Sequence, residues 1–301
     1  MIVAYGFEYL VMAINNARSI RVTNPGLAVT LVTNAPQHWT FLAEDFDRVI
    51  HRDEPDEVNR LAKIRCHAFT TAQRVLYIDA DAEVLGDLTP AFRLLDDYDV
   101  LLRPFDLPSK FPHQLGPDLD GQLFPQFMGG IWFFRRTAAT IGFLERWEQR
   151  YLTAGLARDQ PALARAVHDA VDVRFLPMNG VWGSFSRAAA SRTRPDPRIY
   201  HYADVSNDEA VLARCLGIVA ELEGRIEPTD TAWREDVAVT ARRLTRLASP
   251  WYRSPITNQI ARRFWRWRDR SAGGSGIDTR KKQPRVLGSS LDSARGPLWS
   301  D

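Results

Sequence analysis

The chain has 301 residues, of which 45% are apolar and 25% are charged, so it holds enough apolar material for a full globular core. This composition excludes disorder along the whole length. The formal net charge is only +2, because a basic segment at residues 251–301 carries +7 and leaves −5 on the first 250 residues. A mildly acidic body argues against nucleic acid as the main substrate, since phosphate backbones require a basic surface on the folded domain.

Cysteine usage and hydropathy indicate a cytoplasmic protein. The two cysteines, Cys66 and Cys215, have neither metal-site nor disulfide-framework spacing, so we expect two reduced, buried thiols. No apolar run approaches the ~20 residues that cross a bilayer. The chain also enters an apolar, strand-like segment at Met1 without a basic leader, which argues against secretion.

The first hundred residues alternate between strand-like and helix-like segments. Short apolar or β-branched runs predict strands at 1–4, 27–32, 48–50 and 74–78, and helical spacing predicts helices at 7–22 and 58–71. The run at 75–78 is continuously apolar, which is typical of a strand buried on both faces of a parallel sheet. This alternation predicts an α/β sheet built from βαβ units.

The rest of the chain is less regular. Residues 106–127 are rich in Pro, Gly and Asp, and a loop of that length is often functional. Further strands are predicted at 131–134, 171–176 and 198–202, and helices from about 137, after 159 and beyond 208. We predict an α/β nucleotide-binding domain at 1–205, a helical extension at 206–270 and a disordered, Gly/Ser/Arg-rich tail at 271–301.

An acidic triplet, Asp79-Ala80-Asp81, follows the buried strand predicted at 74–78. This position is the carboxyl edge of the sheet, where open α/β folds bind ligands. Residues i and i+2 of an extended chain share a face, so the two carboxylates can converge, and a hard divalent cation would neutralise their repulsion. The alternative is an ordinary solvated turn.

A series of short motifs in a fixed order favours the functional interpretation. The motifs are Ala4-Tyr5-Gly6 with Tyr9, Ala62-Lys63, Arg74 to Asp81, Gly129 to Arg135, Asp159-Gln160, Leu176 to Gly180 and Ile199 to Tyr202. Together, over residues 1–205, they resemble the retaining glycosyltransferases of the glycogenin and bacterial galactosyltransferase type, glycosyltransferase family 8. The resemblance implies the GT-A fold, a Rossmann-like, mixed but mainly parallel sheet flanked by helices.

The resemblance also implies an activity, a cofactor and two substrates. The activity is transfer of a hexose from a nucleotide-diphosphate sugar, with UDP as the nucleotide, to a glycan or lipid-linked acceptor, with retention of configuration. Asp79 and Asp81, with His201, are expected to bind Mn²⁺ or Mg²⁺, and a histidine nitrogen suits manganese beside carboxylates. The commoner role of a lone histidine is a structural one.

Further residues are assigned to the donor and acceptor by the same resemblance. Lys63 is expected to contact the donor's phosphate or sugar, and Asp159 and Gln160 to bind the transferred sugar near the reacting carbon. The remaining contacts with the donor, or for the last residue on the acceptor side, are expected from Ala4, Tyr5, Gly6, Tyr9, Ala80, Gly130 and Asn179.

Three of these assignments have structural alternatives. Lys63 lies about 200° round a helix from Leu61, so it points away from the packed face and could be a solvated surface lysine. Tyr9 could pack in the core against its own helix. Asp159 lies two residues before Pro161 at a predicted helix start, which suits an N-cap.

The sequence departs from the resembled pattern at two places. Met128 stands where the family commonly has an asparagine that contacts the sugar, and methionine is a poor hydrogen-bonding residue. The segment 203–208 lacks the glycine and lysine that clamp the diphosphate, so another residue must neutralise it or binding is weaker. These departures leave open an alternative function, a sugar-nucleotide or glycan binding protein on a decayed transferase fold.

A predicted basic amphipathic helix lies within residues 251–270. Its apolar face carries Ile256, Ile260, Phe264 and Trp267, and arginines occupy its other positions. Such a segment is expected to lie on an anionic membrane at the inner face, where a lipid-linked acceptor would be found. The alternative is that it packs back on the enzyme with its arginines in water.

Overall fold

A computed structural model describes residues 1–52, 59–104, 125–155, 159–187 and 196–249. The strands are β1 (Ile2–Ala4), β2 (Thr30–Thr33), β3 (Arg48–His51), β4 (Arg74–Ile78), β5 (Ala82–Val84), β6 (Val100–Pro104), β7 (Phe127–Arg135), β8 (Phe175–Pro177), β9 (Trp182–Ser184) and β10 (Ile199–His201). The α-helices are α1 (Phe7–Thr23), α2 (Asn59–Ile64), α3 (Thr89–Leu94), α4 (Ala138–Thr153), α5 (Gln160–Asp169), α6 (Glu209–Glu223) and α7 (Thr231–Ala248). Short 3₁₀ helices span Thr40–Glu44, Arg65–Phe69 and Val205–Asn207.

The central sheet is mixed. β1, β2 and β3 pair in parallel, and β4, β7, β6 and β8 form a second run in that order. Two backbone hydrogen bonds with the pattern of a parallel pair, Met1 N to Leu76 O at 2.7 Å and Ile78 N to Met1 O at 3.1 Å, join β1 to β4. β1, β2 and β4 therefore end at the same edge. β7 runs antiparallel to both β4 and β6.

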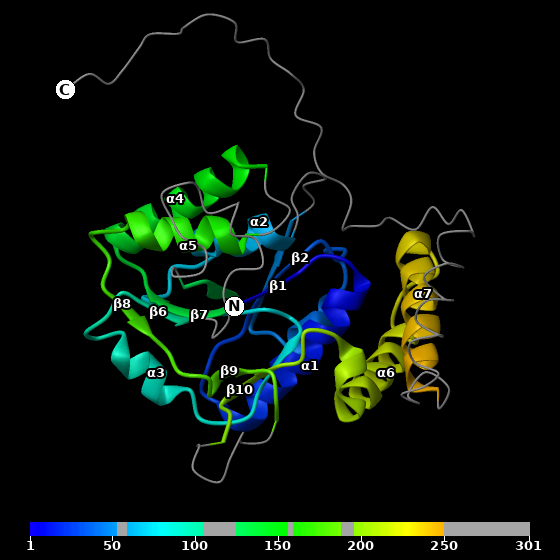
Figure 1. The fold of residues 1–301 in the computed structure, drawn as a ribbon. Helices are drawn as coiled ribbons and strands as arrows, with labels where there is room; N and C mark the ends of the chain where they lie inside the picture. The colour runs from blue at the N-terminus through cyan, green and yellow to red at the C-terminus, as the bar shows by residue number, and fades with distance from the viewer. Residues whose placement is uncertain (53–58, 105–124, 156–158, 188–195, 250–301) are drawn as a thin grey trace, which may run out of the picture.

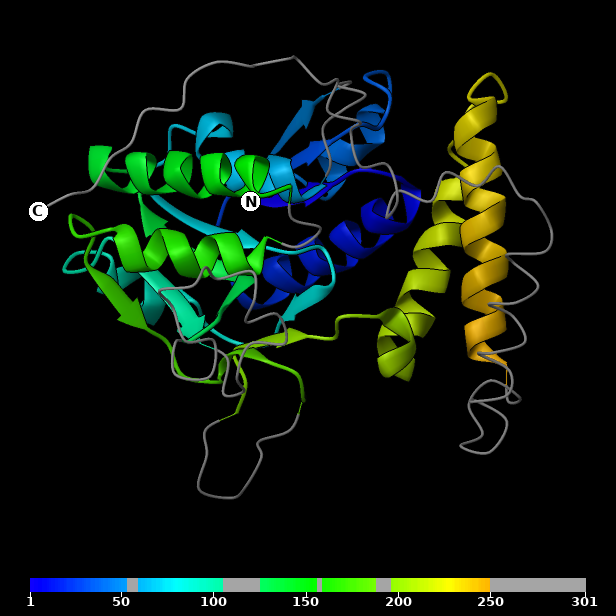
Figure 2. The same cartoon turned by 45° about the horizontal axis from the view of Figure 1, so that its top comes forward.

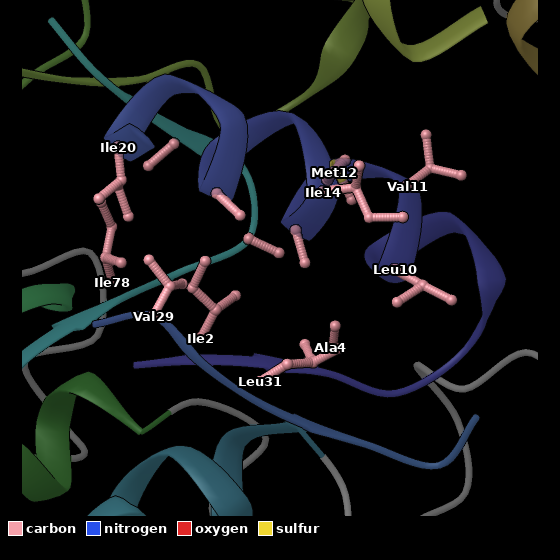
Figure 3. Close-up of a cluster of buried hydrophobic side chains, with 14 of the residues drawn as sticks. Ile2, Ala4, Leu10, Val11, Met12, Ile14, Ile20, Val29, Leu31 and Ile78 are labelled. Atoms are coloured by element: carbon pink, nitrogen blue, oxygen red, sulfur yellow. The ribbon is translucent and has the colours of Figure 1, made fainter. Parts of the chain in front are cut away.

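Helices cover both faces of this sheet, and α6 and α7 form a pair beside α1 at one end (Figures 1 and 2). On one face, Leu10 and Ile14, one turn apart on α1, pack against Ile2 and Leu31 of the sheet (Figure 3). All four are at most 1% exposed, and each contributes roughly 1.5–3 kcal/mol by burial. The other face is covered by α2, α4 and α5.

β4 contributes to both apolar clusters, because its side chains alternate between the two faces. Leu76 and Ile78 belong to the cluster under α1, whereas Val75 and Tyr77 belong to the cluster under α4 and α5. The prediction of a strand buried on both faces is therefore confirmed. A smaller sheet follows at the edge: β5, directly after the acidic triplet, pairs antiparallel with β10, which pairs in parallel with β9.

Most predicted elements are present with shifted ends, and some differ. The helix predicted at 58–71 ends at Ile64 and continues as a 3₁₀ helix, and the strand predicted at 171–176 is only Phe175–Pro177. The strand predicted at 131–134 is part of the longer β7, which includes residue 127 of the predicted loop. Strands β5, β6 and β9 and helix α3 had no counterpart in the sequence prediction.

The two cysteines are free and buried, as expected. None of the helices in the described ranges is long and apolar enough to span a membrane. The predicted basic helix within 251–270 and the predicted tail at 271–301 lie outside the described residues, as does most of the loop predicted at 106–127.

Candidate metal centre

The acidic triplet connects β4 to β5 at the edge where β1 and β2 also end. Its backbone is fixed from three sides: Asp79 N donates to Gly130 O at 2.7 Å, Asn16 Nδ2 donates to Asp79 O at 2.9 Å, and Tyr202 N donates to Asp81 O at 3.1 Å. The Tyr77 hydroxyl also donates to Asp79 Oδ1 at 2.8 Å. The backbone of the triplet is therefore held by β7, by α1 and by the residue after β10, and the Asp79 carboxylate is held by β4.

His201 reaches the triplet from β10, 120 residues beyond Asp81 along the chain. β10 pairs with β5 so that His201 lies opposite Ala82, and its Nε2 comes to 3.1 Å from Asp81 Oδ1. Asp79, Asp81 and His201 each offer a ligand atom, and these atoms all lie within 4.8 Å of one another. The structure thus brings together the three residues predicted to bind a metal.

The electrostatics of this cluster favour a cation. Burial raises the pKa of Asp79, and the neighbouring Asp81 raises it further. Burial opposes ionisation of Asp81 as well, but attraction to His201 and their hydrogen bond bring the pKa of Asp81 below its ordinary value. Two carboxylate oxygens and one imidazole nitrogen are a suitable set of ligands for Mn²⁺. Mg²⁺ would also accept the two oxygens, but it has less preference for a nitrogen ligand.

Lys63 is buried, which corrects the prediction that it points away from the packed face. It is 7% exposed, and its ammonium lies 2.6 Å from Asp159 Oδ2 and 4.0 Å from Asp79 Oδ1. Burial disfavours the Lys63 cation, but the nearby carboxylates of Asp159 and Asp79 raise its pKa overall. Lys63 is therefore a buried positive charge between the group of Asp79, Asp81 and His201 and the start of α5.

Asp159 is the residue before α5, but its side chain makes no capping hydrogen bond to that helix. The structure therefore differs from the N-cap role that the sequence offered as an alternative for this side chain. Burial raises the pKa of Asp159, yet Lys63 more than compensates and lowers it. A β-carbon at Gly129 would lie only 2.9 Å from Asp159 Oδ2, so the chain of β7 leaves no room for a larger residue there. Gln160, the next residue, is half-buried at the first position of α5.

The end of β1 is held by two asparagines. Tyr5 N donates to Asn59 Oδ1 and Gly6 N donates to Asn34 Oδ1, both at 2.8 Å, while Ala4 is fully buried. Gly6 has φ 89°, a conformation that favours glycine, and is the residue before α1. Asn59 and Lys63 lie one turn apart on α2, so one short helix contacts both the end of β1 and the acidic cluster.

Other predicted site residues fall into two groups. Ala80 is buried within the triplet, and a β-carbon at Gly130 would overlap Asp79 Oδ2, so both touch the cluster. Tyr9 is 36% exposed, so the alternative of core packing is wrong. Asn179 is exposed, and its side-chain oxygen accepts a hydrogen bond from Val181 N at 3.2 Å. No described contact joins Asn179 to Asp79, Asp81 or His201.

Several supporting residues were missed by the sequence interpretation. Asn16, Asn34, Asn59 and Tyr77 all hydrogen-bond the site, and three of them contact backbone atoms. Asn59 and Tyr77 had a usable signal. Asn59 lies four residues before Lys63 on a predicted helix, and Tyr77 lies two residues before Asp79 along a predicted strand, where residues i and i+2 share a face. Asn16 and Asn34 are brought in by the folding of separate elements.

The chain is similar to a family of sugar-nucleotide enzymes. A family model described as nucleotide-diphospho-sugar transferase matches residues 40–203, which include Lys63, Asp79, Asp81, Asp159 and His201. A search of the curated proteins finds no match.

Solved structures of several glycosyltransferases match the chain. The apo form of the glycosyltransferase GlyE of Streptococcus pneumoniae superposes with a TM-score of 0.50, at 16% identity, over 74% of this chain and 63% of GlyE. Mouse xyloside xylosyltransferase 1 gives 0.45, at 11% identity, over 66% of this chain and 96% of that one. Galactosyltransferase LgtC, with donor and acceptor sugar analogues, gives 0.43, at 14% identity, over 82% and 95%. The likeness to GlyE concerns the fold alone, which is the GT-A fold expected from the sequence.

Proposed function

Because the chain belongs to the nucleotide-diphospho-sugar transferase family, we propose that it uses a divalent cation to transfer a hexose from a nucleotide-diphosphate sugar. The observation that carries this proposal is the convergence of Asp79, Asp81 and His201 at the carboxyl edge of the sheet. UDP is the proposed nucleotide, and a glycan or a lipid-linked sugar is the proposed acceptor. Retention of configuration is part of the proposal.

Asp79, Asp81 and His201 are the residues that would hold Mn²⁺ or Mg²⁺. When bound, such a cation neutralises negative charge on the departing diphosphate, which is worth several kcal/mol of barrier. His201 must lose its proton to serve as a ligand, and the nearby Asp81 favours the protonated form in the absence of a cation. Asn16 and Gly130 hold the backbone of Asp79, and the Tyr77 hydroxyl holds its carboxylate, so Asp79 loses little further freedom on binding a cation.

Lys63, Asp159 and Gln160 are proposed to act on the sugar side of this centre. The ammonium of Lys63 lies between Asp159 and Asp79, so it can attract a phosphate or sugar oxygen while keeping Asp159 ionised. Asp159 and Gln160 would accept and donate hydrogen bonds to sugar hydroxyls. The end of β1, with Tyr5 and Gly6, would face the nucleotide base, because Gly6 lets the backbone approach closely.

The direct test is release of nucleotide from UDP-, GDP- and CMP-sugars in the presence of Mn²⁺. We expect turnover with one nucleotide class, loss of turnover with a chelator, and a fall of roughly 100-fold or more in Asp81→Asn, which removes one charged ligand. Asp97→Asn is the matched control, because Asp97 is exposed on the turn after α3. Equal activity in Asp81→Asn and Asp97→Asn would refute the metal centre.

A binding protein without catalysis is the second candidate, favoured by Met128 and by the missing glycine and lysine after His201. Calorimetry separates the two functions. Tight, Mn²⁺-dependent binding of a nucleotide sugar that is neither hydrolysed nor transferred, even with a panel of saccharide acceptors, would favour the binding protein.

We also propose that the protein works in the cytoplasm, in peripheral contact with the membrane through residues 251–270, which lie outside the described structure. Sedimentation with anionic vesicles checks this proposal. Deletion of residues 250–301 is expected to abolish sedimentation, and unchanged sedimentation of the truncated chain would rule the contact out.

A further inference from the structure

Arg243 of α7 joins the first turn of α1 to the turn after β10, two segments that are far apart in the sequence. Its guanidinium forms an ion pair with Glu8, and its Nη2 lies 3.5 Å from Asp204 Oδ2. Glu8 is in the first turn of α1, two residues after Gly6, and Asp204 comes three residues after His201. One side chain of the C-terminal helices thus bridges the first turn of α1, directly after the loop that follows β1, and the turn after His201.

The beginning of α7 contacts the loop after β2 as well. The Asp230 carboxylate accepts from Trp39 Nε1 at 2.7 Å and lies 3.0 Å from His38 Nε2. Trp233 packs edge-on against Trp39, with ring centroids 4.9 Å apart, and against Phe7 at 6.4 Å. The first turn of α1, the loop after β2 and the turn after β10 therefore all contact α7 or the residue before it, and β1 and β2 end at the sheet edge that carries Asp79 and Asp81.

The turn after His201 is one that needs support from outside. Ala203 has φ 59°, and within the described ranges it is the non-glycine residue with positive φ. Such a conformation costs of order 1–3 kcal/mol and persists only where the surroundings fix it. Within the turn, Ser206 N donates to Asp204 Oδ1 at 2.9 Å and Asn207 Nδ2 donates to Tyr202 O at 2.7 Å. Arg243 adds a contact from a different part of the fold.

We propose that Arg243 is a positioning residue of the donor site. It holds the first turn of α1, which directly follows the loop after β1, and the turn after His201 at a fixed separation for the nucleoside diphosphate. The inference rests on the proposed function. It makes α6 and α7, which lie beyond the matched residues 40–203, part of the donor-binding unit and not a separate attachment. Both views of the chain show this pair packed beside α1, the helix that begins at the loop in question (Figures 1 and 2).

The experiment compares Arg243→Ala with Arg242→Ala in the full-length chain. Arg242 is the adjacent, exposed residue of the same helix, so the two variants lose the same side chain from neighbouring positions. Calorimetry measures Mn²⁺ alone and then UDP, GDP and CDP in saturating Mn²⁺. We expect Arg243→Ala to weaken the preferred nucleoside diphosphate about five- to tenfold, the typical size of a coupling between sites. Mn²⁺ affinity should stay within about twofold, because the hydrogen bonds that hold Asp79 to β7 and α1, and the pairing of β10 with β5 at His201, do not involve Arg243.

Conservative variants separate positioning from folding. Arg243→Lys should recover part of the affinity, and Glu8→Gln and Asp204→Asn, which each remove one arm of the bridge, should each show a smaller loss. If Arg243→Ala does not fold, Glu8→Gln and Asp204→Asn still test the inference. Equal nucleotide affinity in the wild type and in these variants, or an equal loss in Arg242→Ala, would overturn the inference. A wild-type chain that binds none of the three diphosphates with Mn²⁺ would instead overturn the proposed function on which it rests.

Discussion

The Lys63 ammonium lies 2.6 Å from Asp159 Oδ2, and both side chains are less than 10% exposed. The pair joins α2 to the start of α5 across the end of β7, where Gly129 leaves space for it. Lys63 is also 4.0 Å from Asp79, so its charge acts on the acidic cluster and on Asp159 at once. A buried charge of this kind affects both stability and ligand binding, and the two effects can be measured separately.

Replacing Lys63 by Met should destabilise the protein by about 3–5 kcal/mol, because Asp159 is left as an unpaired buried carboxylate. Urea unfolding measures this change. Arg60→Met is the control: Arg60 is about half exposed and 4.0 Å from Asp159, so its loss should cost less than about 1 kcal/mol.

The double variant Lys63→Met/Asp159→Asn tests whether the lost stability comes from the unpaired carboxylate. It should recover most of that stability, since the unpaired charge is gone, while the affinity for nucleotide sugar stays low because two proposed donor contacts are missing. If Lys63→Met is as stable as Arg60→Met, the buried pair does not have the strength inferred from its geometry.

Gly130→Ala should weaken the metal site directly. A β-carbon at position 130 would overlap Asp79 Oδ2, so the carboxylate must move away from Asp81 and His201. We expect Mn²⁺ affinity to fall by about tenfold or more, which corresponds to at least about 1.4 kcal/mol. Titration with Mn²⁺ followed by electron paramagnetic resonance measures it.

Gly142→Ala provides the matched glycine control. A β-carbon at Gly142, on α4, meets only the end of the flexible Arg146 side chain at 3.5 Å. Alanine in a helix interior is favoured over glycine by roughly 0.5–1 kcal/mol, so this variant should be at least as stable as the wild type with unchanged Mn²⁺ affinity. An unchanged affinity in Gly130→Ala too would argue against Asp79 as a ligand.

Mn²⁺ affinity should rise with pH. Burial alone lowers the pKa of His201, but the Asp81 carboxylate 3.1 Å away raises it above its ordinary value of about 6.5. Protons therefore compete with the cation at His201 up to a pH above that value, and binding releases a proton there. Calorimetry in buffers of different ionisation enthalpy counts the released protons.

The raised pKa of His201 acts in the opposite direction on the stability of the metal-free protein, which should fall as the pH rises. A raised folded-state pKa stabilises the fold below the unfolded pKa, and this contribution is lost as the pH rises through the folded pKa. His201→Gln should remove both pH dependences near neutrality. A wild-type Mn²⁺ affinity that does not change between about pH 6 and 8 would contradict the role of His201 as a ligand.

The acidic triplet could be located from the sequence because its logic is local. A buried strand followed by Asp-x-Asp fixes the sheet edge and the shared direction of Asp79 and Asp81, and both follow from the period of two along a strand. His201 could be paired with them only through resemblance, since 120 residues separate it from Asp81 and the antiparallel pairing of β5 with β10 brings them together.

The orientation predicted for Lys63 is wrong because its spacing from Leu61 treats one face of α2 as solvated. α2 is a short helix covered by α4 and followed by a 3₁₀ helix. Asp159, which makes burial of Lys63 tolerable, lies 96 residues further along the chain. Period-based reasoning finds the faces of an isolated helix and cannot supply a distant counter-ion.

Glu83→Gln should destabilise the fold by about 3 kcal/mol, because Glu83 is a buried carboxylate shared by several donors. It is 3% exposed, accepts from Asn15 Nδ2 at 2.7 Å, and forms ion pairs with Arg187 and Arg214. For a chain of this size the expected fall in Tm is roughly 6–12 °C. The matched control is Glu148→Gln, whose carboxylate pairs with Arg65 nearer the surface and should cost about 1 kcal/mol or less.

The substitution Glu83→Gln should also disturb the metal centre, because Glu83 lies on β5 opposite Tyr200, the residue before His201. Loosening this pair lets His201 move relative to Asp81, so Mn²⁺ affinity should fall several-fold in Glu83→Gln and stay unchanged in Glu148→Gln. Lower stability with full Mn²⁺ affinity would show that β10 is held by its backbone pairing alone. In that case the network around Glu83 would serve the fold and not the position of the metal ligand.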